Sequence, residues 1–279
     1  MAMKFPTHDR KILQFLREIR FSIDNDSDEL AVDKFSTLCS LFEELCDFNY
    51  EVHEGYIRVE QNGLTIAFPF PLPRIKLEHI ACGYENWLFN KYQLEGFVEV
   101  DQGDTVVDCG AFVGGFSVAC AKIAKSVIAI EPSSLNYFCL DDNLKPYQNS
   151  LSLRFALGDR CGIVSLNCSS SAVEHSLLEP DDGAASYTET VALSRIDTLM
   201  QAIGIDRIDF LKLEAEGFEP EIIYGLGEFR PKKLAIDVSP ERNNESPAHE
   251  IAEVLGRSGY ECRQRGQVLF AKDASSWRS

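Results

Sequence analysis

Short apolar runs alternate with amphipathic stretches along most of the chain. The runs are rich in Val, Ile and Leu and end at polar residues or glycine, which is typical of parallel strands buried on both faces. They cover residues 105–107, 126–130, 151–157, 208–213 and 233–238. The stretches between them carry apolar residues at helical spacing, over residues 116–124, 135–144, 194–199, 220–226 and 249–258. This alternation predicts an α/β domain built on a Rossmann-like, doubly wound sheet that is mostly parallel.

Other stretches add elements to this sheet. Residues 80–94 predict a helix that leads into the first strand, and residues 260–271 predict a closing antiparallel hairpin. Residues 163–167 and 188–193 predict two further short strands. The polar residues 169–176 show no periodicity, so we expect them to form a loop.

The first 80 residues follow a different pattern. Apolar positions at helical spacing predict helices over residues 9–21 and 33–48. Apolar and polar residues alternate in pieces from Val52 to Phe70, and Asn62-Gly63 between them predicts a hairpin turn. We therefore expect a helical and β-hairpin accessory region at 1–80, followed by the main domain at 81–279. The accessory region could cover the sheet edge, close over the site as a lid, or form a contact in a homo-oligomer.

The charge and the cysteines restrict the partners and the compartment. Lys and Arg number 27 and Asp and Glu number 44, so the formal net charge is −17, which disfavours nucleic acids and anionic membranes as partners. There is no apolar run long enough to span a bilayer, and the first ten residues lack the apolar core of a signal peptide. The nine cysteines are odd in number and contain no Cys-x-x-Cys pair. We expect a cytoplasmic protein with free thiols.

The turn after the first apolar run is the most informative stretch. Gly110 and Gly114 follow Asp108 where the chain bends from strand into helix. Glu131 ends the second run, about 20 residues later, where an acidic residue can hold the hydroxyls of a ribose. The glycine spacing is not Gly-x-Gly-x-x-Gly, and the Asp108 carboxylate would repel a phosphate but attract an ammonium group. These features favour S-adenosylmethionine over a dinucleotide.

Four segments resemble the FkbM family of S-adenosylmethionine-dependent methyltransferases. They are the Asp-x-Gly-Ala-x-x-Gly turn at 108–114, Ile130-Glu131-Pro132 with Asn136 and Leu140, Ala156-Leu157-Gly158, and residues 209–219. The resemblance extends over residues 84–240 and implies the class I methyltransferase fold. The sequence departs from the family at two positions, because the family usually has Asn where Phe112 stands and Asp where Glu214 stands.

The turn and the resemblance together assign residues to the cofactor. The expected cofactor-binding residues are Tyr84, Glu85, Asp108, Gly110, Ala111, Phe112, Gly114, Ser117, Glu131, Pro132, Asn136, Ala156, Leu157 and Glu214. Among them, Ala156 and Leu157 are expected at the carboxyl end of the third strand, where they would form an apolar wall beside the adenine.

Lys212, Glu214 and Glu216 are the candidates for catalysis. They alternate in a segment that we expect to be extended, so their side chains would point to the same side. Glu216 or Glu214 would orient the acceptor or act as the base, and Lys212 would hold the carboxylates or the developing oxyanion. The alternative is an internal salt-bridge cluster. His175 in the polar loop could be a base or an ordinary loop histidine.

The metal requirement and the acceptor stay open. Glu214, Glu216 and Asp237 could together bind a divalent cation through oxygen ligands, and the sequence does not decide this. We expect O-methylation of a small hydroxylated molecule, for which the resemblance implies a sugar, a glycolipid headgroup or a polyketide-type product. The alternatives are N-methylation, a non-catalytic module that binds S-adenosylmethionine or a nucleoside, and a nucleotide-dependent oxidoreductase.

Overall fold

The computed structural model describes residues 48–61, 63–69, 83–168, 175–177, 187–242 and 244–274. It divides the chain into two compact units, with the boundary between Tyr84 and Glu85. The helix expected over residues 9–21, nearly all of the helix expected over 33–48, Asn62 and the loop residues 169–174 lie outside the described residues.

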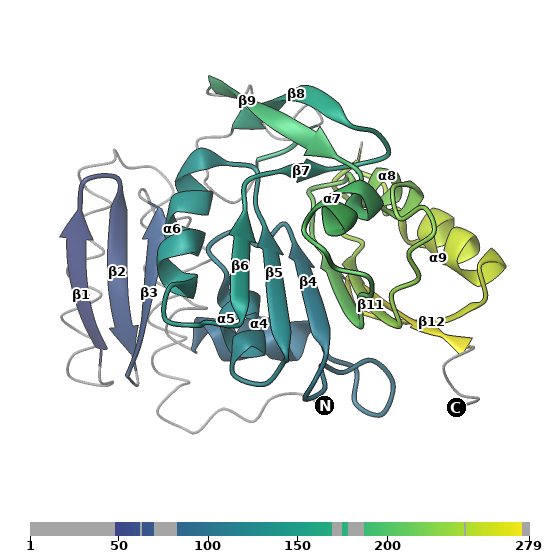
Figure 1. Ribbon diagram of the computed structural model, residues 1–279, viewed down its shortest axis with the longest axis horizontal. Coiled ribbons are helices and arrows are strands. Elements are labelled where there is room, and N and C mark those ends of the chain that lie inside the picture. Colours follow the sequence, from purple (N-terminus) through teal and green to yellow (C-terminus); the bar gives the residue numbers. More distant parts are fainter. Residues whose placement is uncertain are drawn as a thin grey trace. The chain divides into compact units, whose positions relative to one another are not determined.

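The described part of the first unit is an antiparallel sheet in the order β1 (Phe48–His53), β2 (Tyr56–Gln61) and β3 (Leu64–Pro69) (Figure 1). β2 and β3 form the expected hairpin, in which buried Ile57 lies opposite buried Phe68. β1 begins at Phe48, where the sequence predicted the end of a helix. It pairs with β2 along its whole length, and pairing of this kind can override a local preference for helix.

The second unit is built on one large sheet. Its strand order is β12-β13-β11-β10-β4-β5-β6, and the five strands from β11 to β6 run parallel. The bounds are β4 (Thr105–Cys109), β5 (Ser126–Ile130), β6 (Ser150–Leu153), β10 (Phe210–Leu213), β11 (Lys233–Asp237), β12 (Tyr260–Arg265) and β13 (Val268–Asp273). β12 and β13 pair antiparallel and close the sheet beside β11. The predicted Rossmann-like fold with a C-terminal antiparallel hairpin is therefore confirmed.

Helices pack against this sheet and bury its strands. They are α4 (Tyr84–Lys91), α5 (Gly115–Ala121), α6 (Ser134–Leu144), α7 (Ile196–Ala202), α8 (Glu219–Tyr224) and α9 (Ala248–Arg257). Leu199, Ile222 and Leu255 from the last three helices share one core with Leu211 and Ile236 of the strands. All residues of α5 are buried. Within the described ranges, no helix combines the length and the apolar composition that crossing a bilayer requires.

A small second sheet lies beyond the carboxyl ends of β5 and β6 (Figure 1). It has the order β7-β9-β8, with β7 (Ala156–Leu157), β8 (Gly162–Cys168) and β9 (Tyr187–Ser194). The sequence predicted one strand over residues 151–157, but the chain leaves the large sheet after Leu153. The side chain of Arg154 turns to the carbonyl oxygen of Pro132 (3.1 Å), and Gly158 N–H then bonds Ser194 O (3.0 Å) in the small sheet.

Candidate functional site

The glycine turn after β4 is held against the ends of two other strands. Gly110 and Ala111 donate their N–H groups to the carbonyl oxygen of Ile130 at the end of β5 (3.0 and 3.1 Å). Gly110 has φ of +68°, and a Cβ at this position would lie 1.6 Å from the carbonyl oxygen of Glu214. Only glycine allows this approach of two backbones, so the turn and the exit of β10 are fixed together.

Glu131 presents a buried carboxyl directly after β5. Its side chain accepts hydrogen bonds from the N–H groups of Phe112 (2.9 Å) and Ser133 (3.0 Å), and Asn136 Nδ2 lies 3.5 Å away. Burial raises the pKa of Glu131 to about 7, although these donors counteract the shift. Each carboxylate oxygen has two lone pairs, so this group retains the capacity to accept bonds from adjacent hydroxyl groups. Its carboxylate oxygens are acceptors that fit the hydroxyl groups of a ribose.

The N–H of Phe112 points at Glu131 because the backbone of Phe112 has an unusual conformation. Its φ is +51°, in the left-handed region that is uncommon for a residue with a bulky side chain. Asn tolerates this region much better than Phe. The strain at Phe112 is offset by the hydrogen bond that its N–H donates to Glu131.

Asp108 and Lys212 form a buried ion pair beneath the glycine turn. Lys212 Nζ lies 3.0 Å from Asp108 Oδ1 and donates to the carbonyl oxygen of Gly110 (2.7 Å), and Ser117 Oγ donates to Asp108 Oδ2 (2.6 Å). Burial alone would lower the pKa of Lys212, but Asp108 and Glu214 raise it above its usual value. The ammonium partner of Asp108 is thus a lysine of the chain itself, and Asp108 and Ser117 are enclosed in the interior.

Glu214 lies between two lysine ammonium groups. Lys212 Nζ is 3.1 Å from its Oε2, and Lys91 Nζ at the end of α4 is 2.8 Å from its Oε1. The same Lys91 Nζ is 2.8 Å from Asp237 Oδ2. The ammonium group of Lys91 therefore lies between Glu214 and Asp237, two of the three carboxylates that the sequence offered as metal ligands. Among the described residues, no group of three His, Cys, Asp or Glu side chains is placed to hold a metal ion.

Glu216 does not continue the extended segment. β10 ends at Leu213, and Glu216 has φ of +49°, so the expected alternation of side chains holds for Lys212 and Glu214 but stops before Glu216. The expectation of an extended segment is therefore wrong for Glu216. Burial raises the pKa of Glu216 well above its usual value, and repulsion from Glu241 and other acidic neighbours adds to the shift.

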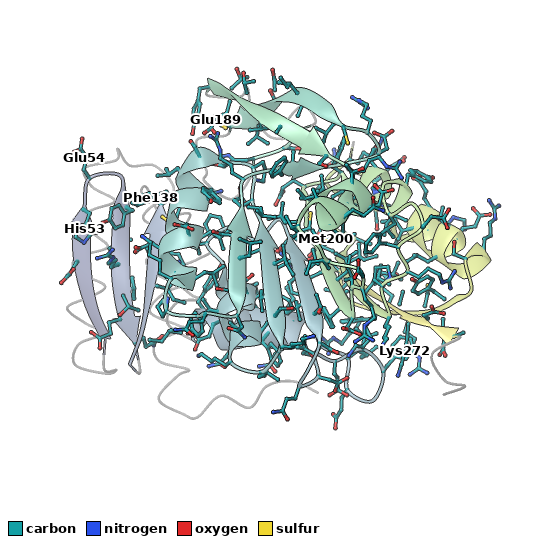
Figure 2. All side chains as sticks on the ribbon, in the orientation of Figure 1. His53, Glu54, Phe138, Glu189, Met200 and Lys272 are labelled. Carbon is teal, nitrogen blue, oxygen red and sulfur yellow. The ribbon has the colours of Figure 1, made fainter. Side chains whose placement is uncertain are left out.

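His175 precedes a residue that is bonded to both the small sheet and the turn of Glu216. The next residue, Ser176, forms a two-way backbone bridge with Asn167 of β8 (2.9 and 3.1 Å) and donates its hydroxyl to Glu216 O (2.9 Å). Burial lowers the pKa of His175, and the charge that opposes this shift is that of Glu189 on β9 (Figure 2). The acidic side chain that affects the pKa of His175 is therefore Glu189, and not the carboxylates around Glu214.

Other predicted cofactor residues belong to several elements. Tyr84 packs the edge of its ring against Phe68 (5.1 Å between centroids), and Glu85 lies 3.7 Å from the ammonium of Lys122. Ala156 and Leu157 are buried in β7 of the small sheet. Gly114, with φ of +82°, packs against the side chain of Leu140.

Sequence reasoning missed three residues of the site. Lys91 carries no sequence signal, because it is one cation in an ordinary helix. Glu219 is fully buried, and its Oε1 accepts the N–H of Ala215 (2.6 Å), while burial raises its pKa to about 7. Glu219-Pro220 at the start of α8 is a helix-start signal that could have indicated this role. Burial and the carboxyl of Glu219 raise the pKa of Glu241 to about 8.

Comparison with known proteins gives one family and several solved structures. Residues 108–262 match the family model described as "Methyltransferase FkbM domain". A crystal structure of methyltransferase FkbM from Methylobacillus flagellatus KT shares 18% identity and a TM-score of 0.43, over 71% of this chain and 53% of that one. This chain thus spans about half of that protein.

Two further structures were solved with a bound cofactor. M. jannaschii TYW2 in complex with AdoMet shares 14% identity and a TM-score of 0.41, over 79% of this chain and 85% of its own. Magnesium protoporphyrin IX methyltransferase from Synechocystis PCC 6803 with bound SAM shares 14% identity and a TM-score of 0.40, over 72% and 81%. No curated protein matches this chain.

Proposed function

Because the chain belongs to the FkbM methyltransferase family, we propose that it transfers a methyl group from S-adenosylmethionine to a hydroxyl group of a small molecule. The observation that best supports S-adenosylmethionine as the cofactor is the buried carboxyl of Glu131 at the carboxyl end of β5. It is held by the N–H groups of Phe112 and Ser133 and can accept two adjacent ribose hydroxyls.

The charge of the neighbouring strand ends supports this cofactor over a dinucleotide. Asp108, Glu214 and Asp237 place three carboxylates at the ends of β4, β10 and β11, against the ammonium groups of Lys91 and Lys212. A pyrophosphate would meet net negative charge there. When bound, S-adenosylmethionine supplies a sulfonium-activated methyl group whose transfer leaves a neutral thioether.

Glu216 is the best candidate for removing the acceptor proton. The carboxylate of Glu214 is already paired with two ammonium groups, those of Lys91 and Lys212. Glu216 instead has acidic neighbours, and burial beside them raises its pKa, which makes its carboxylate a stronger base. Lys212, whose bonds go to Asp108, Glu214 and Gly110 O, positions the glycine turn rather than the acceptor.

Binding of the cofactor is the first test. Isothermal titration calorimetry with S-adenosylmethionine and S-adenosylhomocysteine should give heats of binding with the wild-type chain. Glu131→Ala should weaken both affinities by about 10- to 100-fold, since two charge-assisted hydrogen bonds are lost. The matched control Glu228→Ala, an exposed position, should leave them unchanged. Well-folded protein that gives no heat with either compound would refute the proposal.

The acceptor is the second test. A panel of sugars, glycolipid headgroups, polyketide-type alcohols and primary amines would be incubated with methyl-labelled cofactor, and labelled products would be identified by mass spectrometry. We expect methyl ethers. On the best acceptor, Glu216→Gln should lower turnover by about 10²- to 10⁴-fold, the usual contribution of a general base. Label found only on amines would exclude O-methylation, and unchanged turnover would remove Glu216 from the mechanism.

A further inference from the structure

The turn between β10 and α8 is open to a ligand at Glu216. Residues 214–216 are partly exposed, whereas Leu213 before them and Gly217 after them are buried. Glu216 and Gly217 have φ of +49° and +89°, so two successive residues lie in the left-handed region. Glycine adopts this region at little cost, but a glutamate does not. Contacts from outside the turn must therefore hold the backbone of Glu216 in place.

The residues before Glu216 are fixed by the large sheet and by α8. The N–H of Glu214 donates to the carbonyl oxygen of Cys109 at the end of β4 (3.1 Å). The N–H of Ala215 donates to the buried carboxyl of Glu219 at the start of α8 (2.6 Å). Neither bond reaches the peptide group that follows Glu216, and the orientation of that group sets the backbone angle ψ of Glu216.

Ser176 contacts this peptide group from another element. Its hydroxyl donates to the carbonyl oxygen of Glu216 (2.9 Å), which lies 40 positions further along the chain. Ser176 is buried, and its own backbone forms the two-way bridge with Asn167 (2.9 and 3.1 Å). Asn167 lies in β8, where it pairs with Thr188 of β9. The small sheet thus fixes the donor, and a fixed donor can restrict the residue that it bonds.

The placement of a general base has a large effect on the rate. A displacement of about 1 Å can slow a reaction by about 100-fold. The direction of a side chain follows from the backbone angles of its residue. If Glu216 relaxed from its φ of +49° to a right-handed or extended conformation, its carboxyl would therefore turn away from its present position.

We propose that Ser176 is a positioning residue for the methyl transfer, and that its hydroxyl holds the backbone of Glu216 so that the carboxylate faces the acceptor. This rests on the proposed function, because it takes Glu216 as the base that removes the acceptor proton. Ser176 acts on the reaction through Glu216 and takes no part in proton transfer itself. The small sheet thereby contributes to catalysis, because it fixes Ser176.

The test is a double-mutant cycle on the transfer of labelled methyl to the best acceptor. Ser176→Ala should lower kcat by about 5- to 20-fold, as expected when one hydrogen bond that supports the base is lost. The KM of the acceptor and the Kd of S-adenosylhomocysteine should stay within about threefold, because the hydroxyl binds neither ligand. In a Glu216→Gln background there is no base to position, so adding Ser176→Ala should change kcat by less than about twofold.

Two variants separate positioning from a general loss of structure. Ser176→Thr keeps the hydroxyl on a residue type that suits an extended bridge, and its kcat should stay within about threefold of the wild-type value. Ser150→Ala is the matched control, because the hydroxyl of Ser150 also donates to a backbone carbonyl oxygen, that of Tyr147 (2.7 Å), but at the amino end of β6. It should leave kcat unchanged. If Ser176→Ala does not fold, Ser176→Cys carries the same comparison, because a thiol is only a weak donor.

Two results would overturn the role of Ser176. One is an equal loss of kcat in the wild-type and Glu216→Gln backgrounds, and the other is a raised KM of the acceptor with an unchanged kcat. A different result would locate the failure in the proposed function. If Glu216→Gln alone keeps full turnover, Glu216 is not the base, and the role of Ser176 is refuted together with it.

Discussion

Single residues of this site adopt backbone conformations that their side chains do not favour. Phe112 and Glu216 both have positive φ, of +51° and +49°. Each lies in a turn at the end of a parallel strand. The N–H of Phe112 donates to Glu131, and the carbonyl oxygen of Glu216 accepts the hydroxyl of Ser176, so each turn is fixed by a hydrogen bond to another segment. Such strain persists only where surrounding contacts determine the backbone, and it is typical of functional turns.

The strain at Phe112 can be measured by comparing two truncations. Phe112→Ala and Phe112→Gly both remove the ring, but only glycine adopts a φ of +51° without cost. We expect the glycine variant to be more stable than the alanine variant by up to about 1 kcal/mol in urea denaturation. In ordinary helix or strand positions the order is reversed. A more stable alanine variant would show that the turn is not strained at this residue.

Gly110 should tolerate no side chain. In Gly110→Ala the added Cβ would lie 1.6 Å from the carbonyl oxygen of Glu214, and a backbone atom cannot move aside easily. We expect a loss of unfolding free energy on the order of 3 kcal/mol. Gly204→Ala is the control, because Gly204 has a similar φ of +75° with nothing within 4 Å. It should cost only about 1 kcal/mol, and equal costs would contradict the close approach.

At the scale of elements, a side chain of β9 caps the N-terminus of α6. Ser133 is the N-cap of α6 but makes no side-chain cap. Glu189 of β9 instead accepts the N–H of Ser134 (2.9 Å) and its hydroxyl (2.8 Å), and it pairs with Arg154 (2.7 Å). One carboxylate thus fastens the small sheet to the segment that carries Glu131.

Removing this carboxylate should loosen both elements. We expect Glu189→Ala to lower the unfolding free energy by about 1–2 kcal/mol, the usual range for a lost N-cap plus a half-buried ion pair. Glu253→Ala breaks an exposed pair with Arg257 within α9 and should cost less than about 0.5 kcal/mol. Denaturation curves of the two variants that coincide would argue against a capping role for Glu189.

The sequence predicted elements where burial decides the pattern. The parallel strands are apolar runs because both of their faces are covered, so the sequence predicted them. It also predicted the turn at Gly110, because the backbone there requires glycine. The break between β6 and β7 was missed because the contact made there, from Arg154 to Pro132 O, joins residues 22 positions apart and leaves no local pattern. Lys91 was missed because its role comes from contacts 123 residues away in the chain, which leave no local pattern.

At the scale of the whole molecule, buried carboxyls make stability depend on pH. Burial raises the pKa values of Glu131 and Glu219 to about 7, from 4.5 when they are exposed in the unfolded chain. Between pH 5 and 7 the folded protein therefore binds more protons than the unfolded chain, and its stability falls as the pH rises. The formal charge of −17 adds repulsion in the same direction.

We therefore expect the unfolding free energy to be higher at pH 6 than at pH 8, by on the order of 1–3 kcal/mol at constant ionic strength. Glu219→Gln separates the buried carboxyl from the general charge effect. An amide oxygen can still accept the N–H of Ala215, which Glu219 bonds at 2.6 Å, but it cannot ionise. The variant should gain stability at pH 8 and lose little at pH 6, so that its profile in urea denaturation is flatter. A wild-type profile that rises from pH 6 to pH 8 would mean that these carboxyls are ionised at little cost, and Glu131 could then accept ribose hydroxyls without first losing a proton.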